Sequence, residues 1–259
     1  MTIAIIGTGN MGGAIMRGLI QSGACRPEEF ICTAKTETTL DKISGYNPRI
    51  RTSKDNASAA AEADIIILAV KPWLVGVVME EIRPVLRPNN QILVSVAAGI
   101  TLGQLSEMAG ALPLFRAIPN TAVEALCGVT VTAHYGASDE QVSQVQSLFS
   151  ALGYALVVEE KLIPAATSLT SCGIAFAMRY IRAAMEGGVE LGFRPDEAAR
   201  LVEHTVKGAA TLLLESGMHP EAAIDKVTTA GGITIKGLNA MERSGFTAAV
   251  IDGLKATNV

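Results

Sequence analysis

The sequence predicts an α/β protein in which a mostly parallel sheet covered by helices is followed by an all-helical C-terminal region. Three observations support this fold class. Short apolar and β-branched runs alternate with helical patterns over the first 160 residues, which is typical of parallel strands joined by helices. The run Ile65–Val70 is continuously apolar, as expected of a strand covered on both faces. After Glu160 the strand patterns stop, and apolar residues recur at helical spacing.

The expected strands are short apolar runs that end at polar or turn-forming residues. They are Ile3–Ile6, Phe30–Thr33, Ile65–Val70, Ile92–Val96, Leu114–Ile118, Val129–Ala133 and Ala155–Val158. Helical patterns between them cover Met11–Ser22, Ala57–Ala63, Leu74–Val85 and Asp139–Leu152. Ser138 and Gln141 form a capping-box pattern, which predicts the start of the last of these helices.

An apolar stripe predicts a long helix after the sheet, ending near Gly192. Its members fall on one helical face: Ile174, Met178, Ile181, Met185 and Val189. Pro195, followed by two acidic residues, predicts a second helix that runs to Glu215 and stops at Gly217. A short helix opens at His219-Pro220, and a final pair follows from Ile235.

The change of pattern near residue 160 predicts a domain boundary, with 161–259 as an all-helical domain. Its helices are rich in Ala and Gly, and they are too few to enclose a generous core. We therefore expect them to bury their apolar faces against a second copy of the chain, in an obligate homodimer.

Composition and charge exclude several classes of protein. Of the 259 residues, 49% are hydrophobic and 18% charged, which excludes disorder as the main state. The net charge is −4 and no basic run is present, so neither nucleic acid nor an anionic membrane is the expected partner. The longest uncharged run, Leu162–Met178, falls short of the ~20 apolar residues that a membrane span needs.

The remaining composition predicts a cytoplasmic protein without a metal site. The N-terminus is apolar from its third residue, with no charged leader, and predicts a strand rather than a targeting peptide. The four cysteines, Cys25, Cys32, Cys127 and Cys172, have no metal-binding spacing, and we expect reduced thiols. Only three histidines occur, and none lies near another in the sequence.

A glycine-rich turn follows the first expected strand and opens the first expected helix. It has the pattern G-x-G-x-x-G and consists of Gly7, Thr8, Gly9, Asn10, Met11 and Gly12. Glycines at these positions permit a tight turn and close approach of a pyrophosphate, whose charge the helix N-terminus stabilises. An ordinary glycine-rich βα turn is the alternative. In this context we expect residues 1–160 to form a Rossmann-type dinucleotide-binding domain.

The end of the second strand indicates which dinucleotide binds. An NAD site usually has an acidic residue there, whereas Phe30–Thr33 is followed by Ala34, Lys35 and Thr36. Lys35 and Thr36 are suited to a 2′-phosphate, so NADP(H) is preferred. Glu37 argues mildly for NAD(H), which stays open as a second cofactor. Lys35 as a solvated surface charge is the other interpretation.

Two later segments end strands at the edge where a cofactor is expected. The first consists of Ala69, Val70, Lys71 and Pro72, in which the proline prevents the strand from continuing; a plain strand terminator with an exposed lysine is the alternative. The second, Arg116–Thr121, contains Asn120, whose amide is suited to a nicotinamide carboxamide or a ribose. A polar turn bonded to its own backbone is the other interpretation.

The segment Val227–Thr234 is unusual within the helical region because it combines hydroxyls with adjacent glycines. It contains Thr229, Gly231, Gly232, Ile233 and Thr234. Backbone N–H groups at a following helix N-terminus suit a carboxylate, and the glycines permit its approach. The hydroxyl of Thr234 is then placed to face a reacting nitrogen. A threonine cap with a glycine-rich turn is an equal alternative.

These segments together resemble pyrroline-5-carboxylate reductases, which make proline by reducing a cyclic imine with NAD(P)H. The resemblance covers essentially the whole chain. Gly7–Gly12 and Ala69–Pro72 match the family's opening motifs, Arg116–Thr121 is similar to its R-x-M-P-N-T segment, and Val227–Thr234 is similar to its signature V-T-S-P-G-G-x-T.

The resemblance implies roles for individual residues. Backbone N–H groups of Gly232, Ile233 and Thr234 hold the substrate carboxylate, and the Thr234 hydroxyl contacts the ring nitrogen as the catalytic residue. Thr229 stands where the family has Ser and keeps a hydroxyl. Asn56 occupies the place of an Asn that touches the adenosine ribose. These roles make L-proline the product and 1-pyrroline-5-carboxylate the substrate.

The chain departs from the family pattern at three places. Thr170–Phe176 stands where the family has S-G-S-G-P-A-Y, so Ile174 replaces a helix-kinking proline. Ala230 replaces the signature proline, and Ala122 follows the P-N-T segment. These changes leave the polar groups in place and bear on loop stiffness and substrate size.

Two other functions fit parts of the sequence. A related imine or β-hydroxyacid reductase has a similar two-domain plan, but Lys207 and Lys226 lack the glycine context in which β-hydroxyacid dehydrogenases place their catalytic lysine. A non-catalytic NADP-binding sensor is the third interpretation, and the intact Val227–Thr234 segment argues against it.

Overall fold

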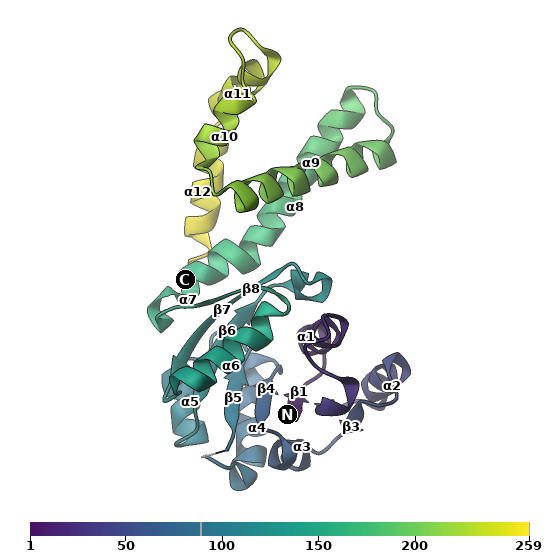
Figure 1. Cartoon of the computed structure of the whole chain (residues 1–259), viewed down its shortest axis with the longest axis vertical. Helices are drawn as coiled ribbons and strands as arrows, with labels where there is room; N and C mark the ends of the chain where they lie inside the picture. Colours follow the sequence, from purple (N-terminus) through teal and green to yellow (C-terminus); the bar gives the residue numbers. More distant parts are fainter. Residues whose placement is uncertain (89, 259) are drawn as a thin grey trace. The chain divides into compact units, whose positions relative to one another are not determined.

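A computed structural model describes residues 1–88 and 90–258. The chain divides into two compact units, Met1–Ser171 and Cys172–Val259 (Figure 1). The first unit is an α/β domain with a Rossmann-type sheet and the second is all-helical, as the sequence predicts. The division lies 11 residues after the boundary expected near 160, because Ile163 is buried in a core of the first unit.

The first unit is built on an eight-stranded sheet with the order β3-β2-β1-β4-β5-β6-β7-β8. Its strands are β1 (Ile3–Ile6), β2 (Phe30–Thr33), β3 (Arg51–Ser53), β4 (Ile65–Leu68), β5 (Ile92–Ser95), β6 (Leu114–Pro119), β7 (Gly128–Tyr135) and β8 (Gly153–Val157). The neighbours from β3 to β6 pair in parallel, β7 is antiparallel to β6, and β8 is parallel to β7. All seven strands expected from the sequence are present. The sequence did not predict β3, which is three residues long and largely polar.

The strand order reverses beside β1, and this reversal defines the edge where a ligand is expected. β1 pairs with β2 on one side and with β4 on the other. Chain segments that follow β1 and β4 therefore leave the same edge of the sheet next to each other, and the Ala69 N–H donates to the Ile6 carbonyl at 2.8 Å. Crevices at such reversals are the usual ligand sites of open α/β sheets.

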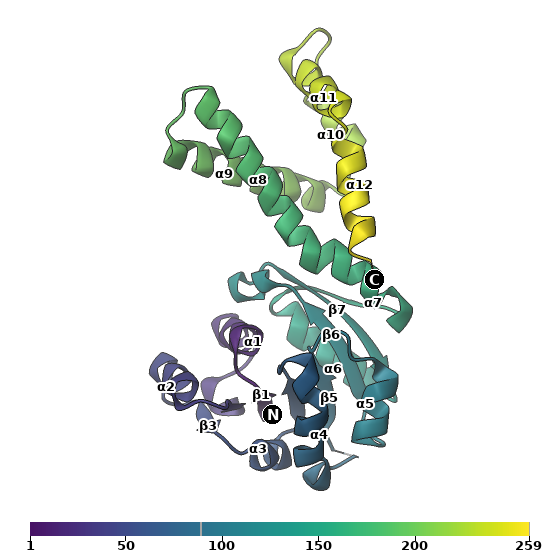
Figure 2. The ribbon, with the colours of Figure 1, turned by 180° about the vertical axis from the view of Figure 1, so that it is seen from behind.

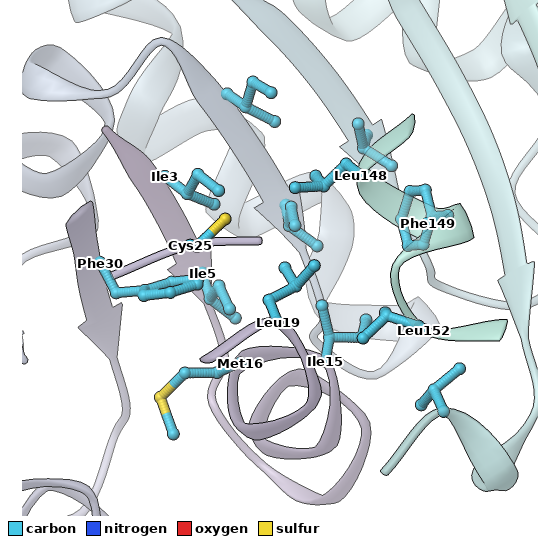
Figure 3. Packing of buried hydrophobic residues seen from close by; sticks show 14 of the residues in the cluster. Ile3, Ile5, Ile15, Met16, Leu19, Cys25, Phe30, Leu148, Phe149 and Leu152 are labelled. Atoms are coloured by element: carbon cyan, nitrogen blue, oxygen red, sulfur yellow. The ribbon is translucent and has the colours of Figure 1, made fainter. Parts of the chain in front are cut away.

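Helices cover both faces of this sheet and enclose two separate cores. On one face lie α1 (Asn10–Gln21), α2 (Glu37–Tyr46) and α6 (Asp139–Ser150); on the other lie α3 (Asn56–Glu62), α4 (Val75–Ile82), α5 (Leu102–Ala109) and α7 (Ile163–Ala166). In Figure 1 α6 lies in front of the sheet, and in Figure 2, from behind, α4 does. Figure 3 shows Ile15 and Leu19 of α1 among Ile3, Ile5 and Leu152.

The helices expected in this unit are confirmed, with the boundaries of the structure. The Ser138–Gln141 capping box is present at the start of α6. The expected Leu74–Val85 helix is α4, flanked by the 3₁₀ turns Pro72–Leu74 and Arg83–Val85. The sequence analysis did not identify α2, which buries only Leu40 and Ile43, or α5.

The second unit consists of α8 (Gly173–Glu190), α9 (Pro195–Ser216), α10 (Pro220–Lys226), α11 (Ile233–Arg243) and α12 (Phe246–Ala256). α8 and α9 approach closely, since a Cβ on Gly188 would lie 3.0 Å from the Ala198 Cβ. Gly217 ends α9 as predicted, and its backbone is in the left-handed conformation. The expected start of the next-to-last helix at Ile235 is wrong by two residues, because Gly232 is the N-cap and α11 begins at Ile233.

Most apolar surface of the second unit is not covered within the chain. Ala198 is the one residue of the described part of this unit that is buried. Large side chains that are more than half exposed include Met178, Leu191, Leu201, Leu212, Leu214 and Ile233. Exposed apolar surface of this extent is typical of a protein–protein interaction surface.

One continuous helical run, Glu160–Glu190, meets the length and composition criteria for a membrane span, with a window of mean hydropathy 1.2 that is 11% buried. This result differs from the expectation that no segment reaches that length. Helices in the cores of soluble proteins meet the same criteria. The run includes a π-helical turn at Thr167–Cys172, which ends two residues before Ile174, the residue that stands where the family pattern has proline.

Candidate active site

The glycine-rich turn after β1 has little room for side chains on its protein side and is open on its outer side. Gly7 has φ +89°, and a Cβ there would lie 2.6 Å from Val70 Cγ1. At Gly12, a Cβ would lie 2.8 Å from the Gly7 carbonyl oxygen. A Cβ at Gly9 would meet no atom within 4 Å. The turn therefore needs glycine at Gly7 and Gly12 for packing, whereas Gly9 leaves the backbone accessible.

Hydrogen bonds fix this turn and leave the helix N-terminus available. The Thr8 N–H donates to the Thr33 carbonyl at 2.8 Å, and the Gly9 N–H donates to the Gly7 carbonyl at 2.8 Å. Among the described residues, the N–H groups of Asn10, Met11 and Gly12 have no hydrogen-bond partner. The first turn of α1 also contains no acidic residue. These donors and the open face at Gly9 fit a pyrophosphate.

A chain of polar side chains leads from this turn to the expected ribose position. The buried Thr33 hydroxyl accepts from the Gly7 N–H at 3.3 Å and donates to Asn56 Oδ1 at 2.7 Å. Asn56 Nδ2 in turn donates to Glu81 Oε2 at 2.7 Å. Asn56 is the first residue of α3, which Asp55 caps. The structure thus brings Asn56 next to the glycine-rich turn, and Glu81 is a contact that the sequence analysis missed.

The residues expected to select the dinucleotide lie beyond the carboxyl end of β2. Lys35 and Thr36 are exposed, and Thr36 is the N-cap residue of α2. The Thr36 hydroxyl shares a hydrogen bond of 2.9 Å with the Thr39 hydroxyl. Glu37, which argued for NAD(H), forms an ion pair with Lys54. The sequence analysis did not place Lys54 near Glu37, because the short polar strand before Lys54 carries no apolar signal.

The segment after β4 lies against the glycine-rich turn. β4 ends at Leu68, so Ala69 and Val70 are already outside the strand, and the Val70 side chain limits the space at Gly7. Pro72 begins a 3₁₀ turn. Lys71 is exposed, and the side chain of Trp73 makes little contact within the chain, at 75% exposure.

Asn120 is buried and its side chain is bonded within the first unit. Oδ1 accepts from the N–H groups of Ala122 and Val129, each at 3.2 Å, and Nδ2 donates to the Thr170 carbonyl at 3.2 Å. The alternative interpretation, a polar turn bonded to its own backbone, is therefore correct for the Oδ1 atom. One Nδ2 hydrogen remains for a ligand.

In the second unit, the segment before α11 forms a tight turn. The Gly232 N–H donates to the Thr229 carbonyl at 2.9 Å, and Gly231 has φ +71°. A positive φ at the third residue of such a turn is typical of type II, which favours proline at the second residue. Ala230 holds that second position. Because the Gly232 N–H is bonded in this turn, the donors left at the helix N-terminus are those of Ile233 and Thr234, together with that of Ile235.

Comparisons with known proteins agree with both halves of this description. Residues 160–259 match the family model described as pyrroline-5-carboxylate reductase dimerisation. Residues 2–99 match the model described as NADP oxidoreductase, coenzyme F420-dependent.

Curated relatives align along nearly the whole chain. Pyrroline-5-carboxylate reductase 2 of Dictyostelium discoideum is 35% identical, over 97% of this chain and 89% of that protein. The Arabidopsis thaliana pyrroline-5-carboxylate reductase is 34% identical, over 98% and 92%. The chain spans 48% of the length of a third relative, pyrroline-5-carboxylate reductase 1 of Dictyostelium discoideum, at 36% identity.

Solved structures extend this agreement to the fold. A pyrroline-5-carboxylate reductase from Coxiella burnetii superposes with a TM-score of 0.92 at 29% identity, over 99% of this chain and 95% of that one. Pyrroline carboxylate reductase from Plasmodium falciparum, solved with NADP bound, superposes with a TM-score of 0.88 at 25% identity, over 99% of this chain and 95% of that one. Since relatives above 30% identity align over most of their own length, the chain belongs to the pyrroline-5-carboxylate reductase family.

Proposed function

We propose that this protein is an NAD(P)H-dependent oxidoreductase that reduces 1-pyrroline-5-carboxylate to L-proline, the last step of proline biosynthesis. The observation that carries this proposal is the turn Thr229–Gly232, which leads into the open N-terminus of α11. A dinucleotide-binding turn alone suits many oxidoreductases. A carboxylate-binding segment in the same chain restricts the substrate to an acid.

The dinucleotide is held by the first unit. N–H groups of Asn10, Met11 and Gly12 receive the pyrophosphate, while Gly7, Thr8 and Gly9 shape the turn. Asn56 binds the adenosine ribose, and the remaining contacts come from Ala69, Val70, Lys71, Pro72 and Asn120. When bound, the reduced nicotinamide supplies the hydride that the C=N carbon accepts.

Lys35 and Thr36 favour NADPH over NADH. Both are exposed at the end of β2, where a 2′-phosphate is expected and where no acidic residue precedes α2. Because Glu37 is nearby, NADH is retained as a weaker alternative.

Residues of the second unit bind and orient the substrate. N–H groups of Ile233 and Thr234 donate to its carboxylate, and Thr229, Gly231 and Gly232 form the turn that presents them. The Thr234 hydroxyl positions and polarises the ring nitrogen. A protonated imine accepts hydride more readily, and we assign no general acid to this chain.

The domain roles follow from this assignment. Residues 1–160 bind the dinucleotide, and 161–259 bind the substrate and form a homodimer. An apolar groove of about 510 Å³ in the second unit, lined by Phe176, Tyr180, Met241, Phe246 and Val250 among others, supports the homodimer, as does the exposed apolar surface of α8 and α9. A partner helix in this groove exchanges water for apolar contact. We place the enzyme in the cytoplasm.

Reduced-nicotinamide absorbance tests this function. Pyrroline-5-carboxylate is added to the enzyme in parallel with NADPH and with NADH. We expect oxidation of both, with the larger kcat/KM for NADPH. If neither is oxidised while NADPH still binds, the chain is a related imine or β-hydroxyacid reductase, or a sensor, and other cyclic imines and β-hydroxyacids are then tested.

A further inference from the structure

Two lysines lie at the carboxyl ends of adjacent strands at the edge of the sheet. Thr33 at the end of β2 is opposite Ser53 at the end of β3, and the Ala34 N–H donates to the Ser53 carbonyl at 3.4 Å. Lys54 directly follows Ser53, and Lys35 directly follows Ala34. Both therefore leave the sheet at the edge where the ribose of a dinucleotide is expected.

The two lysines differ in their surroundings. Lys54 Nζ is paired with Glu37 Oε2 at the start of α2, and the two side chains are 58% and 66% exposed. Lys35 forms no ion pair with a described residue. Two nearby acidic side chains have partners of their own: Asp55 accepts from the Ser58 N–H, and Glu81 accepts from Asn56.

An exposed ion pair of this kind is easily exchanged. Such a pair contributes at most about 1 kcal/mol, and a phosphate monoester carries nearly two negative charges at neutral pH. A 2′-phosphate at the end of β2 therefore competes effectively with the single Glu37 carboxylate for Lys54. The same carboxylate repels that phosphate, while its oxygens accept hydrogen bonds from an unmodified ribose.

We propose that Lys54 and Glu37 together set the preference between NADP(H) and NAD(H): Lys54 binds the 2′-phosphate, and Glu37 opposes it. This inference rests on the proposed dinucleotide site and deepens it. It concerns the nucleotide alone and is independent of which imine or acid the second unit binds.

The test uses 2′,5′-ADP and 5′-AMP, which differ by the phosphate in question, with the full-length protein in isothermal titration calorimetry. Lys54→Ala lowers the affinity for 2′,5′-ADP by about fivefold, the size of one exposed ion pair. It changes the affinity for 5′-AMP by less than about twofold. Glu37→Gln tightens 2′,5′-ADP by a similar factor. Arg51→Ala is the matched control, because it removes an exposed cation of the same strand that pairs with Glu62; it leaves the ratio of the two affinities unchanged. Each selectivity effect shrinks as salt is raised.

Several outcomes would overturn the inference. Lys54→Ala that weakens both nucleotides equally, or neither, removes Lys54 from selectivity, and Glu37→Gln that weakens 2′,5′-ADP removes the opposing role of Glu37. If the wild-type protein binds neither nucleotide, the dinucleotide site itself is wrong and the inference fails with it. If the expected pattern is found but pyrroline-5-carboxylate is not reduced, the inference stands and only the proposed reaction fails.

Discussion

Arg116 on β6 and Glu160 at the start of the helical run form an ion pair, with Nη1 3.2 Å from Oε1. The same carboxylate oxygen accepts from the N–H of Leu102, the first residue of α5, at 2.8 Å. The Arg116 side chain is 11% exposed, and its Nε has no hydrogen-bond partner among the described residues. One carboxylate thus holds both a nearly buried cation and a helix N-terminus.

Glu160→Gln should destabilise the first unit. The substitution leaves the Arg116 guanidinium nearly buried without its counter-charge, and hydrogen bonds to charged groups contribute about 2 kcal/mol each. We expect the free energy of unfolding in urea to fall by about 2 kcal/mol. Glu159→Gln is the matched control, because Glu159 pairs with Lys161 in solvent, and its effect should stay within about 0.5 kcal/mol. Equal effects of the two variants would contradict this account.

Gly9→Ala and Gly12→Ala should separate cofactor binding from stability. A Cβ at Gly9 meets no protein atom within 4 Å, so unfolding should change by less than about 0.5 kcal/mol, while NADPH binding weakens about tenfold or more because the pyrophosphate is kept away. Gly12→Ala should lower both the affinity for NADPH and the free energy of unfolding, the latter by about 1–3 kcal/mol because of overpacking. NADPH fluorescence titration and urea unfolding check the pair. Unimpaired NADPH binding by Gly9→Ala would place the cofactor elsewhere.

Thr234→Ala should lower kcat/KM for pyrroline-5-carboxylate by roughly tenfold or more, since a hydrogen bond in the transition state is worth ~1.5 kcal/mol. Thr234→Ser retains the hydroxyl and should recover most of the loss. Thr205→Ala is the control, because that hydroxyl is bonded to the Leu201 carbonyl within α9 and should leave the kinetics unchanged. Wild-type kinetics for Thr234→Ala would remove this residue from the mechanism.

Ala230→Pro should stiffen the turn Thr229–Gly232, which belongs to the proposed substrate site. The second residue of a type II turn accepts proline, and among the described residues the Ala230 N–H donates no hydrogen bond that the substitution would remove. We expect the free energy of unfolding to rise by about 0.5 kcal/mol and the KM for the substrate to fall. Gly231→Ala, at φ +71°, should lower stability by about 1 kcal/mol. A raised KM in Ala230→Pro would show that the turn must move.

The buried thiols predict a loss of stability at alkaline pH. Burial raises the pKa of Cys32 to about 12 and that of Cys25 to about 11, whereas in the unfolded chain both titrate near 9. Keeping both thiols protonated therefore costs the folded state nothing below pH 9. As pH rises from 9 towards the folded pKa values, the free energy of unfolding falls by about 1.4 kcal/mol per pH unit for each thiol. Cys32→Ala should show a shallower fall in unfolding free energy between pH 9 and 11. Cys127→Ala, which removes an exposed thiol, should keep the wild-type slope, and parallel curves for all three proteins would refute the prediction.

The sequence predicts the fold where burial governs local structure. Ile3–Ile6 and Phe30–Thr33 are predicted to the residue because every position of these strands is buried. β3 is missed because an edge strand of three residues buries none of them. The start of α11 is misplaced because a glycine cap followed by β-branched residues has no strong helical signal.

The candidate site is less predictable than the fold, because the groups available to a ligand are those that form no hydrogen bond with neighbouring backbone. The resemblance implies that the Gly232 N–H holds the substrate carboxylate, yet this N–H donates to the Thr229 carbonyl. The Asn120 Oδ1 atom likewise accepts hydrogen bonds from two backbone N–H groups. Lys54 lies next to the β2 end only through strand pairing, which no local pattern contains.

The near absence of buried residues in the second unit has a consequence for how the enzyme is made. Ala198 is the one buried residue in the described part of the second unit, whereas the first unit has cores of its own. In the proposed homodimer, the second unit would therefore gain most of its stability when two chains meet. If the homodimer forms as proposed, a newly made chain would pass through a stage in which the first unit is folded and the helical unit is still open to proteases. The length of that stage depends on how many sister chains are nearby, so the supply of active enzyme should rise more steeply than the rate of synthesis.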